Sequence, residues 1–95
     1  MKINEIKAGM RNVEVKDAVV MGVGPSREVF TKSGPMKVSD HVLGDDTAEI
    51  GFSVWNEDIG RFTVGDRISI SNAYITTYKG KNSISLGKFG KATVE

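Results

Sequence analysis

The chain of 95 residues has 13 basic and 12 acidic side chains, a formal net charge of +1 and no cysteine. This length predicts one domain, and the balanced charge excludes a general polycation. The lack of cysteine excludes disulfides, cysteine-based zinc sites and a thiol nucleophile. No apolar run approaches the roughly 18 residues of a membrane span and no signal-peptide core is present, so we expect a cytoplasmic protein without membrane association.

The first half of the chain predicts a short lid followed by two strands. Residues 2–10 have apolar side chains at helical spacing until a glycine interrupts them, which predicts a lid over one end of a sheet. Residues 12–24 alternate apolar and polar, and Gly22 and Gly24 mark an expected bulge or sharp bend. A second strand-like run covers residues 27–43 and is interrupted by a Ser-Gly-Pro sequence.

The second half of the chain predicts three further strands. A Gly-Asp-Asp-Thr turn at residues 44–47 leads into residues 48–55, in which alternation is strict. The acidic connector, residues 56–62, is too short and too interrupted by glycine for more than one helical turn. Strands follow at residues 67–78 and 83–89, with a lysine- and glycine-containing turn between them.

Short strands, glycine bends and the lack of a long helix predict an all-β fold, specifically a small antiparallel barrel or sandwich. The bent first strand and the short connector between the third and fourth strands favour a five-stranded OB-fold barrel with a short N-terminal helical turn. An SH3-like barrel is the alternative. We find no linker or internal repeat, so residues 1–95 are expected to form a single OB-fold domain.

The single tryptophan is predicted to lie on the polar face of its strand. Along residues 48–55 the apolar side chains alternate onto one face, and Trp55 falls on the other face at the end of the strand. Two interpretations follow. The indole of Trp55 is either presented to solvent beside polar residues, or it folds over the mouth of the barrel and seals it.

The two tyrosines, Tyr74 and Tyr78, have an ambiguous orientation. Strict alternation from the preceding isoleucines would turn both inward. A bulge near residues 71–72 would instead reverse the phase, bury Ile75 and turn Tyr74, Thr76 and Tyr78 toward solvent. The neighbouring hydroxyl and lysine side chains favour the outward orientation, because a buried tyrosine hydroxyl needs a hydrogen-bond partner.

With that orientation, three aromatic rings share one polar face with basic and hydroxyl-bearing side chains, while acidic residues gather in the turn at 44–47 and the connector at 56–62. Unpaired bases stack on aromatic rings, lysine and arginine neutralise phosphates, and hydroxyls donate to phosphates or base edges. The pattern therefore predicts a site for single-stranded nucleic acid. The candidate binding residues are Trp55, Tyr74, Tyr78, Arg27, Thr31, Lys32, Ser33, Lys37, Thr76, Lys79, Lys81 and Ser85.

Residues 43–87, LGDDTAEIGFSVWNEDIGRFTVGDRISISNAYITTYKGKNSISLG, resemble the archaeal single-stranded DNA-binding proteins that have a single OB fold, and the related human sensor proteins of single-stranded DNA. They are also similar to one OB repeat of archaeal replication protein A. The shared pattern is a Gly-Asp-Asp turn, a strand ending in Trp, an acidic connector, Gly-Asp, and Asn-Ala-aromatic with a second aromatic four residues later before Lys-Gly. The resemblance covers residues 2–91 and implies that Trp55, Tyr74 and Tyr78 stack on bases.

The sequence departs from that family in three places. Tryptophan or phenylalanine is common in the family where this chain has Tyr74 and Tyr78. Many members have a glycine-rich or acidic C-terminal tail that recruits partners, whereas this sequence stops at Glu95. Some human-type members have an additional aromatic residue at the position of Ser85.

Together, the residues and the resemblance predict a non-catalytic, nucleoid-associated protein that coats and protects exposed strands in DNA replication, repair or recombination. Its expected ligand is single-stranded DNA, or single-stranded RNA, with replication or repair proteins as further partners. A protein-interaction OB module and an RNA-binding OB domain are the alternatives. No cofactor or metal is expected, because His41 has no second histidine or cysteine to act as a co-ligand. His41 is expected at the surface or in packing. Phe30 and Phe89 are expected in the core or at its rim, with a role as additional stacking surfaces as the alternative.

Overall fold

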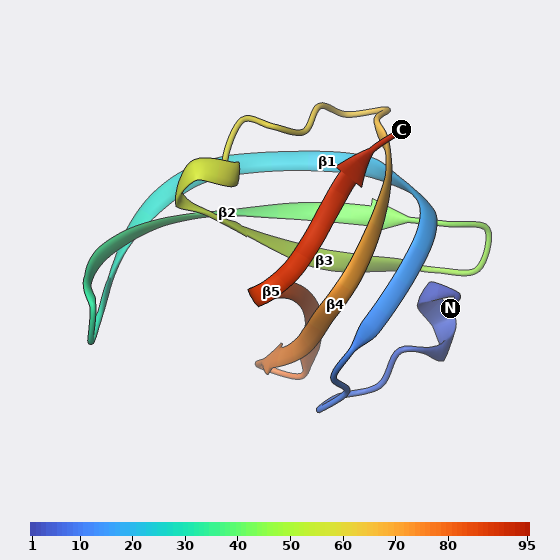
Figure 1. Ribbon diagram of the computed structural model, residues 1–95, viewed down its shortest axis with the longest axis horizontal. Coiled ribbons are helices and arrows are strands. Elements are labelled where there is room, and N and C mark those ends of the chain that lie inside the picture. The colour runs from blue at the N-terminus through green and yellow to red at the C-terminus, as the bar shows by residue number, and fades with distance from the viewer.

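The computed structural model describes the backbone of residues 1–95, and all side chains except those of residues 57, 78 and 87–89. Five strands close into a barrel in the order β1-β2-β3-β5-β4 (Figure 1). The β3–β5 pair is parallel and the others are antiparallel. The predicted five-stranded all-β barrel is confirmed. Its elements are η1 (Ile3–Glu5), β1 (Val13–Thr31), β2 (Gly34–Gly44), β3 (Glu49–Trp55), η2 (Asn56–Asp58), β4 (Arg67–Tyr78) and β5 (Lys81–Val94).

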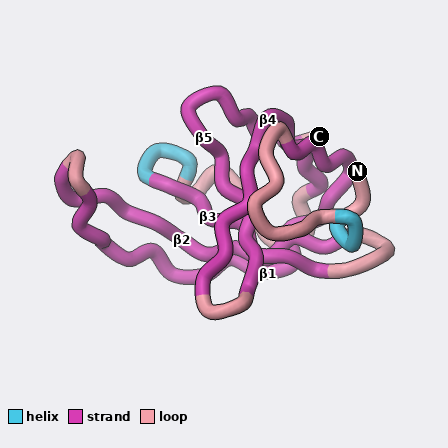
Figure 2. Tube along the Cα trace, turned by 90° about the horizontal axis from the view of Figure 1, so that it is seen from below, coloured by secondary structure: helices cyan, strands magenta, loops and turns pink.

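β1 is longer than predicted, because the chain turns back only at Lys32 and Ser33, and the Gly-Pro of the interruption already begins β2. Gly34 adopts a φ of 104° directly after this turn, and Thr31 Oγ1 donates a hydrogen bond to its carbonyl oxygen at 2.9 Å. Residues 27–38, which we call the β1–β2 arm, extend beyond the barrel (Figure 1). Figure 2 shows that the arm lies on the side of the molecule away from both chain ends.

β5 also continues past its predicted end at residue 89. Its last residues pair with the first part of β4, from Ser71 opposite Lys91 to Ile68 opposite Val94. This pairing satisfies backbone groups of β4 that would otherwise be left without a partner on that side. The extension therefore depends on a contact between strands, and the local sequence does not reveal it.

Glycine allows β1 to bend against β2 where a bend was predicted. The β1–β2 register shifts between Val20 and Gly22 and again between Val23 and Ser26. At Gly24, an added Cβ would lie 2.6 Å from the carbonyl oxygen of Asp40, so the two backbones approach too closely for any side chain. The expected bulge or bend is confirmed.

A bulge in β4 decides which way the side chain of Tyr74 points. The β4–β5 register shifts between Ser71 and Ala73, and Asn72 has a φ of 54°. Asparagine tolerates this left-handed conformation better than most residues. The side chain of Ile75 is consequently buried and that of Tyr74 is 40% exposed. The predicted reversal of phase is confirmed for Tyr74.

The N-terminal lid closes one end of the barrel, as predicted. Ile3 and Ile6 are buried in the core, and Asp45 of the β2–β3 turn holds the lid in place. Asp45 Oδ2 accepts a hydrogen bond from the Ile3 backbone N–H at 2.8 Å. Its Oδ1 accepts from the backbone N–H groups of Thr47 at 2.7 Å and Ala48 at 3.1 Å. One carboxylate therefore joins two segments that are far apart in the sequence.

His41 packs inside the barrel, with only 1% of its surface exposed. Its ring meets those of Phe52 and Phe62 edge-on, with centroids 6.3 Å and 6.2 Å away. Nδ1 lies 3.3 Å from the Ser39 hydroxyl, and Nε2 has no partner among the described residues. Burial lowers the pKa of His41, because the charged imidazolium loses its hydration. The expected packing role is confirmed.

We expect the free energy of unfolding to decrease as the pH falls below about 6.5, the ordinary pKa of histidine. Because the pKa of folded His41 is lowered, the unfolded chain takes up the proton first. The contribution of neutral His41 to the free energy of unfolding is therefore fully present above that pH. It declines as the pH falls toward the folded pKa, by at most about 1.4 kcal/mol per pH unit. Urea unfolding between pH 7.5 and 5 measures the change. His41→Phe keeps a ring in place and should flatten this dependence; an equal slope in both proteins would contradict the prediction.

Candidate nucleic-acid interface

An open groove of about 500 Å³ crosses the outer surface of the barrel and receives residues from all five strands. Its floor is formed by small side chains, including Ser53 and Ser83. At Gly51, an added Cβ would lie 2.7 Å from Ser83 Oγ, so the absence of a side chain there lets β3 and β5 approach closely. The two strands therefore lie close together beneath the groove, which is lined by serine hydroxyls at this point.

Two of the predicted aromatic residues lie on the same outer face as this groove. Trp55 is half-buried at the end of β3, and alternation places it on the side of Ser53. Tyr74, on β4, lies two strands away from β3 and on the same face, because Ser53 of β3 pairs with Ser85 of β5 and Ser85 pairs with Tyr74. The side chain of Tyr78, the third predicted aromatic residue, is outside the described residues.

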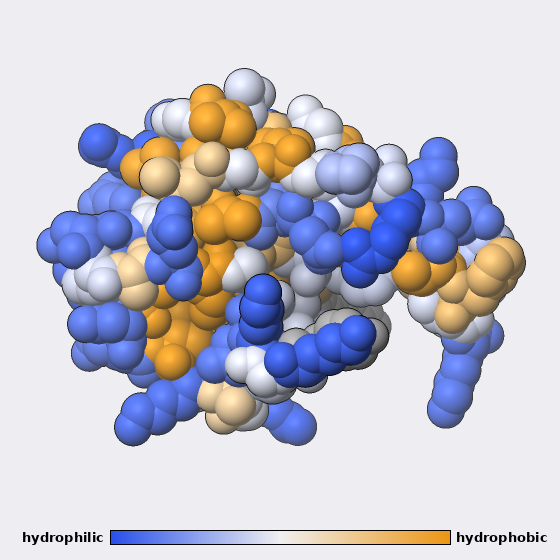
Figure 3. All heavy atoms as spheres, turned by 180° about the vertical axis from the view of Figure 1, so that it is seen from behind, coloured by the Kyte–Doolittle hydropathy of each residue, from blue (hydrophilic) through white to orange (hydrophobic). Residues whose placement is uncertain are grey.

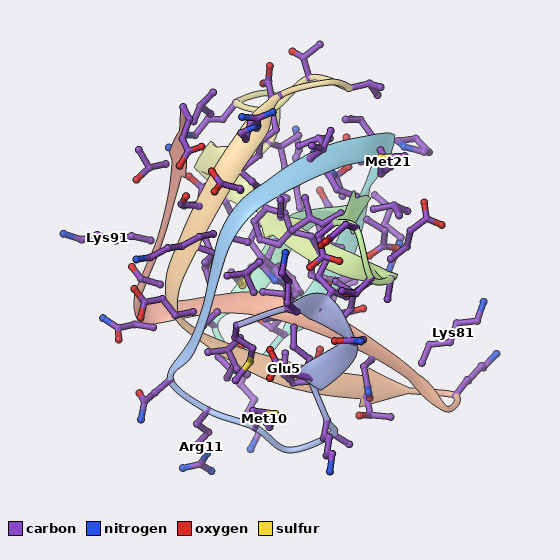
Figure 4. All side chains as sticks on the ribbon, turned by 90° about the vertical axis from the view of Figure 1, so that its right-hand side faces the viewer. Glu5, Met10, Arg11, Met21, Lys81 and Lys91 are labelled. Carbon is purple, nitrogen blue, oxygen red and sulfur yellow. The ribbon has the colours of Figure 1, made fainter. Side chains whose placement is uncertain are left out.

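Cationic side chains reach the groove from two hairpins. Arg27 comes from the β1–β2 arm, and Lys81 from the end of the β4–β5 hairpin. Figure 4 shows Lys81 extending from that hairpin into solvent. Thr76 also lines the groove, and Lys79 lies in the hairpin turn with a φ of 52°. These four predicted residues are therefore brought to the same region.

The predicted residues of the hairpin turn, Thr31, Lys32 and Ser33, lie at the tip of the arm. The Thr31 hydroxyl accepts a hydrogen bond from the Ser33 N–H at 3.2 Å and donates one to the Gly34 carbonyl oxygen. It therefore stabilises the turn. Figure 3 shows hydrophobic surface at the end of the arm, where Phe30 is 82% exposed. The expectation that Phe30 packs in the core or at its rim is wrong, because the arm projects beyond the barrel. The side chain of Phe89 lies outside the described residues.

Lys37 was predicted beside the aromatic residues, but the register places it on the opposite face of the arm. Val38 lies across from both Arg27 on β1 and Trp55 on β3, so those three residues share one face. Lys37 is the neighbour of Val38 and pairs with Glu28. Adjacent strand residues point to opposite sides, and Lys37 therefore points away from the groove.

The structure also argues against the predicted contact between Ser85 and nucleic acid. It lies on the groove side of β5, in register between Ser53 and Tyr74, yet only 3% of its surface is exposed. A small side chain between larger neighbours in a sheet is readily covered by them. Its hydroxyl is therefore withdrawn from solvent, and the structure does not support direct contact with a phosphate.

The groove contains an acidic residue that the prediction overlooked. Asp40 Oδ2 accepts a hydrogen bond from Arg27 Nη1 at 2.5 Å. Alternation along β2 could have placed Asp40 outward, but its contact with Arg27 depends on the β1–β2 register. The predicted separation of acidic residues from the binding face is therefore incomplete.

A larger hollow, of about 660 Å³, lies near the N-terminus. Basic Lys16 and Arg67 line it together with acidic Asp45 and Asp46. None of the described residues around this hollow is aromatic. Trp55 and Tyr74 do not line the smaller groove itself, but they lie on the outer face that carries it, which makes the smaller groove the better candidate for nucleic acid.

Residues 5–94 match the family model of Ssb-like single-stranded DNA binding proteins with an OB fold. The chain belongs to this family. The predicted family and OB fold are thereby confirmed, and the SH3-like alternative is excluded. The Ssb-like family is non-enzymatic.

Relatives of this Ssb-like chain include single-stranded DNA binding protein Ssb of Saccharolobus solfataricus, which is 28% identical over 86 residues. The match covers 90% of this chain but 57% of that protein. The OB domain of Ta0387 from Thermoplasma acidophilum has the same fold, with a TM-score of 0.84 at 22% identity, covering 100% of this chain and 85% of that one. The second OB-fold domain of replication protein A from Methanococcus maripaludis gives a TM-score of 0.75 at 26% identity, covering 99% and 92%.

Of the side chains that the structure describes, two basic ones and one acidic one line the groove of this Ssb-like chain. Arg27 and Lys81 stand on different hairpins, and Asp40 is the one acidic side chain among the described residues that line the groove. None of the described groups of histidine and carboxylate side chains is arranged to hold a metal ion. No helix among the described residues is long and apolar enough to cross a membrane.

Proposed function

We propose that the protein binds single-stranded DNA in the groove and so coats and protects exposed strands in replication, repair or recombination. Bases stack on Trp55 and Tyr74, Lys81 neutralises phosphates, and Arg27 adds positive charge beside the bound strand. Tyr78 is a third stacking residue on the basis of the sequence alone. The observation that carries the proposal is the bulge in β4, because it turns a tyrosine ring toward solvent beside a groove with a low, polar floor.

Single strands suit this surface better than a duplex does. Every unpaired base has a free face that can stack on an aromatic ring, and each such contact contributes roughly 1–3 kcal/mol. The bases of a duplex already stack on one another and leave the rings without a partner. Membership of the Ssb-like family supports the same ligand. Contact with replication or repair proteins stays a prediction.

Titration of tryptophan fluorescence with oligo(dT) tests the proposal, since Trp55 is the single tryptophan. We expect the emission to change on binding, and the affinity to fall as salt increases, because phosphate contacts release counterions. Unchanged emission at micromolar protein would argue against the proposal. Competition with an RNA oligomer of matched sequence distinguishes DNA from RNA binding.

Tyr74→Ala is expected to weaken binding of oligo(dT) by about 1–2 kcal/mol, because one stacking surface is lost. Tyr74→Phe should keep most of the affinity, since the ring remains. Phe30→Ala is the matched control, because it removes another exposed ring, on the face of the arm that points away from Arg27. Fluorescence anisotropy of a labelled oligonucleotide measures all three. Equal losses in Tyr74→Ala and Phe30→Ala would contradict a specific role for Tyr74.

A further inference from the structure

A carboxylate in a groove that binds a polyanion requires an explanation. Asp40 lines the groove, and 60% of its side chain is exposed despite its ion pair with Arg27. An ion pair this exposed adds little to stability. At the same time, the negative charge repels phosphates that come near it. Asp40 therefore favours a bound strand that presents a base edge here rather than its backbone.

The register relates Asp40 to an aromatic ring. Asp40 pairs with Ser53, Ser53 with Ser85, and Ser85 with Tyr74, which gives one row across four strands. At the usual strand spacing, the two ends of this row are about 14 Å apart. The serines between them are small and leave room above the sheet. While one base stacks on Tyr74, a neighbouring base of the strand can therefore lie over the serines and direct its edge toward Asp40.

Carboxylates accept hydrogen bonds but cannot donate them, which discriminates among unpaired bases. Guanine presents two adjacent donors, N1–H and N2–H, that match the two carboxylate oxygens. Cytosine and adenine present only an amino group, next to a ring nitrogen that is an acceptor. Thymine places carbonyl oxygens on both sides of its single N–H, and these oxygens are repelled. Arg27, beside Asp40, can donate to guanine O6.

We propose that Asp40, oriented by Arg27, selects guanine at one position of the bound strand. This inference rests on the proposed function, because it assigns a base preference to the same groove. Stacking surfaces are tolerant of sequence. Asp40 adds to them a single hydrogen-bonding contact that depends on the base.

The experiment uses oligonucleotides of one length, either all dT or with one dG placed at each position in turn. We expect the wild-type protein to bind the best-placed dG oligonucleotide about 5- to 30-fold more tightly than all-dT. Asp40→Ala should abolish that preference and bind all-dT at least as tightly as the wild type, since a repulsive charge is removed. Asp46→Ala is the matched control, because Asp46 is also an exposed, ion-paired carboxylate but lies outside the groove. It should keep the wild-type preference.

The outcomes separate this inference from the proposed function. Wild-type binding of all-dT without any preference for dG would overturn the selection of guanine and leave single-strand binding intact. A preference that persists in Asp40→Ala would overturn the role of Asp40. If the wild-type protein bound none of the oligonucleotides, the proposed function itself would fail, and this inference with it.

Discussion

Trp55→Ala is expected to weaken binding of single-stranded DNA by about 1–3 kcal/mol, or roughly 5- to 150-fold. The indole offers the largest stacking surface on the groove face. It stands opposite buried Val38, which gives it an apolar neighbour that limits its motion. A ring held in place loses less conformational freedom when a base stacks on it. For this reason, we expect Trp55 to contribute more than Tyr74.

The fold of Trp55→Ala should persist, since Trp55 is not part of the buried core cluster. Anisotropy of a labelled oligonucleotide measures binding without the lost fluorophore, and thermal unfolding followed by circular dichroism measures stability. Trp55→Phe is the control and should recover most of the affinity. If Trp55→Ala instead unfolds, the indole seals the barrel mouth and its role is structural.

Asp45→Ala is expected to lower the free energy of unfolding by about 2–4 kcal/mol, the largest effect on stability among the substitutions proposed. The carboxylate accepts hydrogen bonds from backbone N–H groups of Ile3, Thr47 and Ala48. Hydrogen bonds to a charged group contribute about 1.5–3 kcal/mol each, although such contributions are not additive. Their loss releases both the β2–β3 turn and the lid that covers the core.

The contribution of Asp45 to the free energy of unfolding should depend on pH. Burial alone would raise the pKa of this carboxyl, but hydrogen bonds from the Thr47 hydroxyl and from the Ile3, Thr47 and Ala48 backbone hold its pKa well below the usual range. Its unfolded pKa is about 3.9, so the stabilisation is complete above about pH 4 and declines as the pH falls toward the folded pKa. The difference between wild type and Asp45→Ala should therefore shrink in acid.

Urea unfolding at pH values from 7 to 2 measures both effects. Asp46→Ala is the matched control, because the Asp46 carboxylate is exposed and, among the described side chains, pairs only with exposed Lys2. We expect that change to stay within about 1 kcal/mol at every pH. Two results would show that the hydrogen bonds to the lid do not cause the loss of stability in Asp45→Ala. One is an equally large loss in Asp46→Ala. The other is a stability difference between wild type and Asp45→Ala that does not shrink in acid.

The sequence by itself determined the order of the elements and the inward face of the strands in which alternation is clear. Alternation in β3 correctly placed Phe52 and Val54 in the core, and glycines marked the bends of β1. The reversal of phase before Tyr74 was also predictable, because Ala73 and Ile75 are apolar where unbroken alternation would expose them. These features depend on the alternation of side chains along a single strand, which neighbouring residues in the sequence reveal.

Only the tertiary structure decided which residues meet across strands. Asp40 and Arg27 are 13 positions apart and touch because of bulges that set the β1–β2 register. The same register turns Lys37 away, and the β3–β5 and β4–β5 pairings bury Ser85 between neighbours. A slip of one residue would reverse each of these outcomes, since it moves every side chain to the other face. Local pattern specifies a face within a strand, but pairing between distant strands assembles the groove.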